Sequence, residues 1–246
     1  FGTGVDRVIP APGGGRMLDK EPDISGYVVA VSGASNEILW QVPNPRDAFT
    51  TPRFARLNGD DVPDVVMGGR EGILSAFSGQ GGALLWRDTG DAAATTSFPY
   101  NFFTPAVIQY ANGDGESDFV VTYGGDDSAL PRDPRSPGYL AVISGADGAG
   151  LAVKKTPDGG ETYSSPVVYR RADRTQLVVF GTGGETRGGA AYRAPVASLL
   201  DGTFAARTER LIEPGKKGVI APATLADITG DAELDIIISA FDGRLV

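Results

Sequence analysis

The chain has 246 residues, of which 41% are hydrophobic, and this is enough for a sizeable core in one or two domains. Its net charge of −9 argues against nucleic acid or an anionic membrane as a partner, because phosphate binding needs clustered Lys and Arg side chains. Cysteine and histidine are absent, which excludes disulfides, thiolate metal sites and histidine chemistry. Any bound metal would therefore be a hard cation held by oxygen atoms.

Glycine and proline are abundant, with 35 and 17 copies. Together with many short apolar runs, this composition indicates an all-β protein with tight turns. No apolar run reaches the length of a membrane span, so we expect no membrane insertion. The chain begins at Phe1 without a Met, and we expect that a targeting segment was removed or lies outside this segment.

The stretch 51–86 defines the structural unit. Its four short apolar runs are separated by three turns rich in Gly, Asn, Asp and Ser, which is the pattern of strands joined by hairpins. The runs are 54–57, 65–67, 73–77 and 83–86. We predict one four-stranded antiparallel sheet here.

The rest of the chain repeats this unit with a period of about 55 residues, a length typical of propeller blades. A dipeptide ending in proline opens each copy, at Pro52, Pro105, Pro166 and Pro222. We therefore predict an all-β fold, a β-propeller of four-stranded antiparallel blades, in a single domain or fragment covering 1–246. The expected blades are three complete ones and two partial ones: 51–86, 104–152 and 165–207, with 1–43 and 221–246 partial. Phe1 to Gly4 resembles 180–183, a second strand.

The long connections fall on one face of the predicted propeller. In an antiparallel blade, the loops between the second and third strands lie on the same face as the crossovers between blades. The segments 4–25, 124–137, 183–193, 87–103 and 207–218 all belong to this class. We call this side the long-loop face, and we expect the opposite face to have tight turns. Loops on a rigid scaffold are common binding surfaces, although tolerated insertions are the alternative.

Three acidic turns, at 58–64, 112–118 and 227–235, resemble the calcium loop of the FG-GAP/VCBS repeat. That family includes the propeller of integrin α chains and many secreted microbial surface proteins. The resemblance implies a blade with an Asp-rich loop between its first two strands. Alternate oxygen-bearing side chains of such a loop can converge on Ca²⁺, which takes six to eight oxygen ligands.

The match to this loop is uneven. The best candidate ligands are Asp227, Thr229, Asp231 and Asp235, with Ala232 in place of the family's Gly. Arg56 and Tyr110 stand where the first Asp belongs in the two weaker loops, and their remaining candidates are Asn58, Asp60, Asp64, Asn112, Asp114 and Asp118. Any bound Ca²⁺ is expected to be structural. The alternative is that these residues only provide hairpin chemistry, with Asp side chains bonded to nearby N–H groups.

Two segments ending in Trp40 and Trp86 also resemble the tryptophan-docking repeat of PQQ-like propellers. There the Trp packs between blades, and we expect the same here. An aromatic stretch at 98–103 is expected to pack against an adjacent blade, with a role in binding as the alternative. No nucleophile elbow or phosphate loop is present, and no carboxylate pair stands out as a glycosidase site.

The sequence thus predicts a non-catalytic propeller scaffold for adhesion or protein–protein assembly, with Ca²⁺ as its candidate structural cofactor. The expected partner is a protein or glycan ligand on the long-loop face, and the chain could belong to a larger surface assembly. The expected location is extracellular or in the cell envelope, secreted or periplasmic. The alternative function is that of an enzyme, either a PQQ-like oxidoreductase or a polysaccharide-acting propeller.

Overall fold

The structure of the chain is a computed structural model. It describes residues 7–10, 16–19, 26–44, 48–70, 73–88, 101–109, 111–125, 133–243 and 245–246. Almost all regular structure in these residues is β, with two short helices, α1 (Val196–Leu200) and α2 (Phe204–Arg207). Neither helix is long and apolar enough to cross a membrane, and the described residues contain no other helix.

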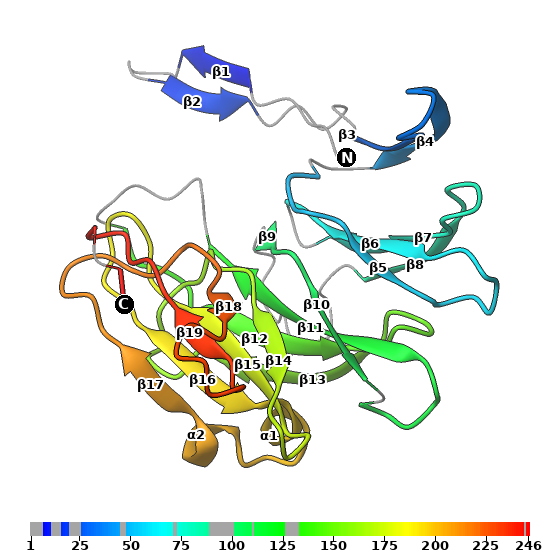
Figure 1. The fold of residues 1–246 in the computed structure, drawn as a ribbon. Coiled ribbons are helices and arrows are strands. Elements are labelled where there is room, and N and C mark those ends of the chain that lie inside the picture. Colours follow the sequence, from blue (N-terminus) through cyan, green and yellow to red (C-terminus); the bar gives the residue numbers. More distant parts are fainter. Residues whose placement is uncertain are drawn as a thin grey trace.

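Two sheets each contain four consecutive antiparallel strands (Figure 1). Blade 2 contains β5 (Arg53–Ala55), β6 (Asp64–Gly68), β7 (Leu74–Phe77) and β8 (Leu84–Asp88). Blade 4 contains β14 (Val167–Arg170), β15 (Gln176–Gly181), β16 (Ala191–Pro195) and β17 (Glu209–Ile212). Short turns between alternating apolar strands produce this up-and-down order.

Blade 3 lies between these two sheets and has an extra strand. It contains β10 (Ala106–Gln109), β11 (Ser117–Gly124), β12 (Tyr139–Ile143) and β13 (Gly150–Lys155), and the short β9 (Asn101–Phe102) also pairs with β11. Blade 1 is the hairpin β3 (Gly26–Val31) and β4 (Ile38–Asn44), and blade 5 is the pair β18 (Thr224–Ala226) and β19 (Asp235–Ile237). The predicted all-β fold of antiparallel blades is confirmed.

The core consists of layers between successive blades. In β11, Phe119 and Val121 contact the cluster shared with blade 2, whereas Val120 contacts the cluster shared with blade 4. In β6, Val66 and Met67 divide in the same way between blades 3 and 1. Because successive side chains of a strand point to opposite faces, an all-apolar strand is buried between two neighbours.

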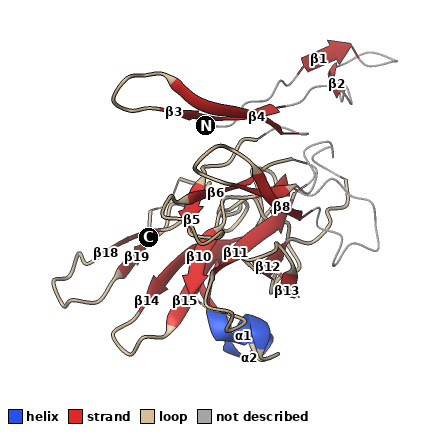
Figure 2. Cartoon of the chain, turned by 90° about the vertical axis from the view of Figure 1, so that its right-hand side faces the viewer, coloured by secondary structure: helices blue, strands red, loops and turns tan. Residues whose placement is uncertain are grey.

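The helices correct one prediction from the sequence. They lie between β16 and β17, on the face expected to have only tight turns, and Figure 2 shows them at one end of the sheets. The fourth strand of blade 4 consequently begins at Glu209, beyond the predicted blade end at 207 and inside the segment expected to be a crossover. Buried Val196, Leu199 and Phe204 explain the insertion, because they fill the space between blades 3 and 4.

The N-terminal part also differs from the prediction. A hairpin of β1 (Arg7–Pro10) and β2 (Arg16–Asp19) lies in the segment expected to be a long loop. The predicted second strand at 1–4 lies outside the described residues. At the other end, Ile238 and Val246 exchange two backbone hydrogen bonds, so the last residues pair with the chain directly after β19. The division into one domain stays a prediction.

Candidate functional site

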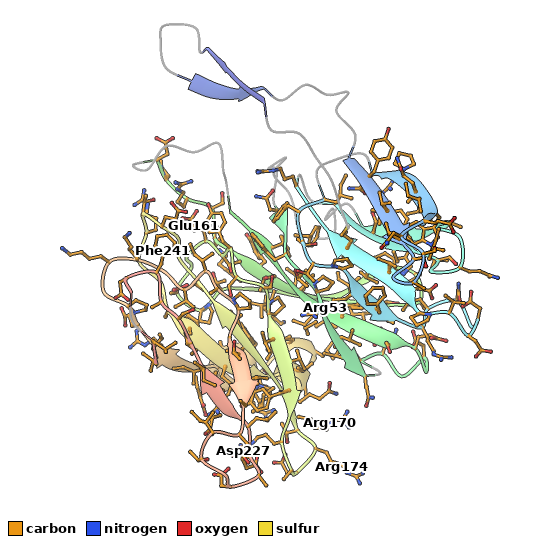
Figure 3. The ribbon with its side chains drawn as sticks, turned by 45° about the horizontal axis from the view of Figure 1, so that its top comes forward. Arg53, Glu161, Arg170, Arg174, Asp227 and Phe241 are labelled. Atoms are coloured by element: carbon orange, nitrogen blue, oxygen red, sulfur yellow. The ribbon has the colours of Figure 1, made fainter. Side chains whose placement is uncertain are left out.

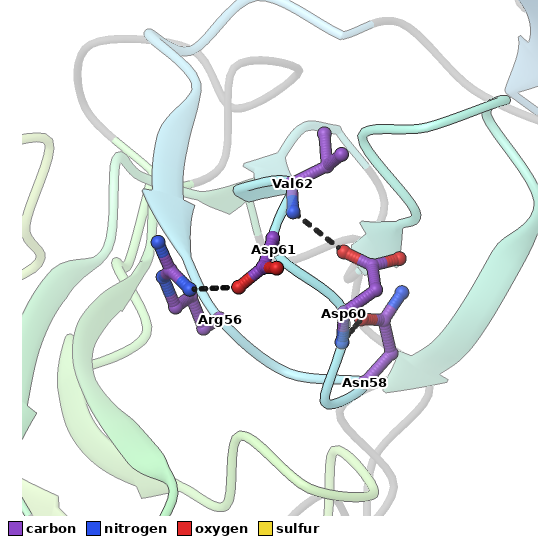
Figure 4. Close-up of polar contacts among 5 residues, drawn as sticks. All are labelled: Arg56, Asn58, Asp60, Asp61 and Val62. Atoms are coloured by element: carbon purple, nitrogen blue, oxygen red, sulfur yellow. Dashed lines mark hydrogen bonds and ion pairs between the residues drawn. The ribbon is translucent and has the colours of Figure 1, made fainter.

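The acidic turns connect the first two strands of blades 2, 3 and 5. In blade 2 the Asp60 N–H donates to Asn58 Oδ1 at 3.0 Å, and the Val62 N–H donates to Asp60 Oδ1 at 2.8 Å (Figure 4). Arg56 and Asp61 form an exposed ion pair, in which Arg56 Nη1 lies 3.2 Å from Asp61 Oδ1. Asn112 and Asp114 in blade 3 accept backbone hydrogen bonds in the same way. These contacts are the hairpin chemistry expected of Asn and Asp in turns.

The last carboxylate of each of these two turns is fully buried. Asp64 accepts hydrogen bonds from the Leu57 N–H at 2.8 Å and the Gly79 N–H at 3.2 Å. Asp118 accepts from the Ala111 N–H and, at 3.1 Å, from the Gly145 N–H. Each carboxylate therefore ties the first hairpin turn of its blade to the turn after the third strand.

The Asp227 loop is more exposed. Asp227 accepts from the Gly230 and Ala232 N–H groups, at 2.6 and 3.0 Å. Asp235 accepts from the Ile228 N–H at 2.9 Å and from both the N–H and the hydroxyl of Thr229. Asp231 accepts from the Glu233 N–H, so each of the four predicted ligands bonds within the loop.

This arrangement does not form a preassembled ion cage. Within the part of the chain that the structure describes, no group of three or more acidic side chains gathers where it could hold a metal. The carboxylates of the Asp227 loop point to backbone N–H groups, and a cation would have to replace those donors. The ten predicted ligands belong to three separate turns of different blades, and calcium binding stays a prediction.

The two tryptophans dock on the neighbouring blade, as predicted. Trp40 Nε1 donates to the Gly79 carbonyl at 2.8 Å, and Trp86 Nε1 donates to the Gly145 carbonyl at 2.7 Å. These are the same two glycines whose N–H groups bind Asp64 and Asp118. Each glycine residue thus connects a tryptophan of the preceding blade, through its carbonyl, to a buried carboxylate of its own blade, through its N–H.

A hollow of about 370 Å³ opens where the proline dipeptides of blades 2 to 5 meet. Its lining includes the hydroxyl residues Thr51, Thr104 and Ser165, the aromatic residues Phe49, Phe103 and Tyr163, and one charged residue, Arg53. These residues lie at the starts of first strands, so the hollow opens on the long-loop face. We call this hollow the axis pocket. Figure 3 shows Arg53, which lines it, in the middle of the sheets, whereas Asp227 lies at one end of them.

Hydrogen bonds around the axis pocket join one blade to the next. The Thr51 N–H donates to Thr104 Oγ1 at 3.1 Å, and the Thr104 N–H donates to Ser165 Oγ at 3.2 Å. Arg53 Nε donates to the Pro105 carbonyl at 3.1 Å. The recurring hydroxyl residue before proline was visible in the sequence, but only the packing of successive blades brings the copies around one hollow.

The aromatic side chains of this pocket form an edge-to-face series. Phe49 and Phe103 have ring centroids 6.0 Å apart, and Phe103 and Tyr163 have theirs 6.1 Å apart, both near perpendicular. Phe49 is 48% exposed, whereas Phe103 is 7% exposed. The described end of the aromatic stretch, Phe102 and Phe103, is buried against adjacent blades as predicted, and residues 98–100 lie outside the described part.

The loops beside the axis pocket contribute the arginine pocket, a second hollow of about 220 Å³ that includes Arg135, Glu161 and Arg187. Glu161 is 4% exposed, and its carboxylate accepts a hydrogen bond from the Tyr163 hydroxyl at 3.1 Å. Tyr163 therefore lies between the two hollows. Sequence analysis missed this cluster, because its residues come from three connections with no common motif.

Comparison with known proteins supports the fold. A quinohemoprotein alcohol dehydrogenase from Comamonas testosteroni is similar with a TM-score of 0.55 and 14% identity, over 97% of this chain and 41% of that one. Saccharomyces cerevisiae Sqt1 gives a TM-score of 0.49 and 15% identity, over 91% of this chain and 65% of that one. The rhamnogalacturonan lyase YesW gives a TM-score of 0.46 and 13% identity, over 99% of this chain and 45% of that one.

The chain spans less than two thirds of the length of each of these structures. At 14% identity the likeness to the alcohol dehydrogenase concerns the fold alone, and this fold is a β-propeller; the other two matches have TM-scores under 0.5 and carry no argument. No protein family and no curated protein matches the sequence, so the FG-GAP/VCBS resemblance stays an interpretation of its turns.

Proposed function

We propose that this chain forms part of a non-catalytic propeller scaffold for adhesion or protein assembly, and that it binds a protein or glycan on the long-loop face. The observation that carries the proposal is the axis pocket, in which a half-exposed Phe49 stands beside hydroxyl groups and Arg53. Aromatic and Arg side chains in such hollows are frequent binding anchors. We expect an extracellular or cell-envelope location and a place in a larger surface assembly.

The test is replacement of Phe49 by Ala. We expect Phe49→Ala to weaken ligand binding about tenfold or more, because truncating an aromatic anchor typically removes at least 1.4 kcal/mol. Ligands would be found with a glycan array and a displayed peptide library, and affinities measured by calorimetry. The control is Ile228→Ala, which changes an even more exposed apolar side chain in the Asp227 loop, away from the pocket.

Two outcomes would contradict the scaffold. In the first, Phe49→Ala has the melting temperature of the wild type and binds the ligand with the same affinity. In the second, neither the glycan array nor the peptide library yields a ligand. A PQQ-like oxidoreductase or a polysaccharide-acting enzyme remains the second candidate, since an aromatic hollow on the propeller axis also suits a substrate. Dye-linked alcohol oxidation after addition of pyrroloquinoline quinone, or release of reducing ends from polysaccharide, would support that candidate instead.

A structural calcium ion in the Asp227 loop is a separate proposal. Binding would require Asp227 and Asp235 to exchange backbone hydrogen bonds for the cation, well away from the long-loop face. We expect calcium to raise the melting temperature, a chelator to lower it, and Asp227→Asn to abolish the response. A melting temperature that is the same with calcium and with chelator would show that the hydrogen bonds suffice.

A further inference from the structure

Three connections on the long-loop face bring two arginines and one glutamate to the arginine pocket. Arg135 comes from the segment between β11 and β12, Glu161 from that between β13 and β14, and Arg187 from that between β15 and β16. Most of the remaining lining is glycine backbone, so charged groups are the main side chains facing the hollow. Figure 3 shows Glu161 at the end of the sheets opposite to Asp227.

The glutamate is already compensated. Glu161 Oε2 lies 3.7 Å from Arg135 Nε, and the two side chains are 4% and 12% exposed. The same oxygen accepts the Tyr163 hydroxyl at 3.1 Å. The ion pair and the hydrogen bond together fix the orientation of the Glu161, Arg135 and Tyr163 side chains.

Among the described residues, no carboxylate compensates the charge of Arg187 in this way. Its Nη2 donates to the Asp133 carbonyl at 2.6 Å, which fixes the position of the guanidinium. Its Nε is buried and has no hydrogen-bond partner among the described residues, and no described carboxylate forms an ion pair with this side chain. A buried N–H without an acceptor costs free energy, and a carboxylate that enters the pocket and displaces the atoms covering this N–H would supply that acceptor.

We propose that the arginine pocket binds a carboxylate side chain from an acidic segment of a partner protein, with Arg187 as its main cation; this deepens, and rests on, the scaffold function proposed above. The planar guanidinium matches the geometry of a carboxylate. A single negative charge suits the site better than a phosphate dianion, because Glu161 repels additional charge. The described lining contains no aromatic ring on which a sugar could stack, which favours an extended peptide over a glycan.

The probe is a terminally blocked peptide of alternating glycine and glutamate, with the glutamine version as its neutral match. We expect the glutamate peptide to shift the NMR signal of the Arg187 Nε–H group, and to bind at least fivefold more tightly than the glutamine peptide at low salt. Arg187→Gln should abolish this preference. Arg187→Lys should retain part of it, because lysine keeps the positive charge but lacks the paired N–H donors of the guanidinium. Arg171→Gln, in the exposed β14–β15 turn, should bind like wild type.

Equal binding of the two peptides, or an unchanged preference in Arg187→Gln with a native melting temperature, would overturn the proposal. Selective binding of an oligogalacturonate through Arg187, without binding of the glutamate peptide, would also overturn it and assign the pocket to acidic glycans. These results leave the scaffold function standing if a ligand still depends on Phe49. Loss of the Phe49-dependent ligand alone would reject the scaffold and not the arginine pocket.

Discussion

At the scale of single residues, the acidic turns combine two kinds of Asp. Asp60 is half-buried and Asp114 is exposed, and each accepts one backbone N–H within its own turn. Asp64 and Asp118 are buried and connect two turns of a blade. The calcium-loop pattern treats all four as equivalent, whereas burial assigns them different contributions to stability.

We expect Asp64→Asn to lower the free energy of unfolding by about 2 kcal/mol. The NH₂ group of the new amide would replace one carboxylate oxygen, and it cannot accept the N–H hydrogen bond that this oxygen now accepts. Asp60→Asn keeps an acceptor oxygen in the turn and should change the free energy of unfolding by less than about 0.5 kcal/mol. Urea denaturation of both variants measures the difference. Equal effects would mean that the buried hydrogen bonds of Asp64 contribute little.

At the scale of structural elements, the turn after the third strand is the docking site for the preceding blade. Gly82 and Gly148 have φ angles of +74° and +77° and lie against the rings of Trp40 and Trp86. In blade 3, Ala152 of β13 pairs with Val142 of β12 at the position where Trp86 pairs with Ala76 in blade 2. The next blade, blade 4, has helices α1 and α2 instead of the receiving turn. The tryptophan and the turn that receives it are therefore lost together, and Leu199 and Phe204 fill the space.

This contact predicts different costs for two glycine substitutions. Gly113 and Gly148 share nearly the same φ, +79° and +77°, but a Cβ at Gly113 meets no atom within 4 Å, whereas one at Gly148 would lie 2.6 Å from Trp86. Both Ala variants should lose about 1–2 kcal/mol from backbone strain. Gly148→Ala should lose about 1–3 kcal/mol more through overpacking. Chemical denaturation would refute the docking role if the two losses were equal.

At the scale of the whole molecule, stability comes from each blade's contacts with its neighbours. Blade 3 has buried clusters on both faces, with Phe119 and Val121 on one side and Val120 on the other. In blade 1, Val28 is the one residue of β3 and β4 that is buried in the cluster shared with blade 2. Ile38 and Leu39 of β4 are 60% and 65% exposed. In stacked repeats of this kind, the units with the fewest buried contacts open first and expose their backbone amides to exchange.

We expect amide hydrogen exchange to be slowest in β11 and β12 and fastest in the hairpins β3–β4 and β18–β19. The physical reason is that an amide in blade 3 exchanges only after both apolar interfaces open, whereas the terminal hairpins open singly. Exchange followed by mass spectrometry of peptic fragments measures this order. Uniform rates across the blades would indicate that the propeller opens as one cooperative unit.

The four strands of blade 2, their antiparallel order and the packing role of the tryptophans could be predicted from the amino-acid sequence. Those features follow from local periodicity and turn chemistry, as in the alternation of Val66 and Met67 between two interfaces. Three features became visible only in the folded chain: the carboxylates of the Asp227 loop bond to N–H groups, helices replace a turn in blade 4, and Arg135, Glu161 and Arg187 share a pocket. The reason is physical: burial and the meeting of distant loops depend on how blades stack, which no local pattern specifies.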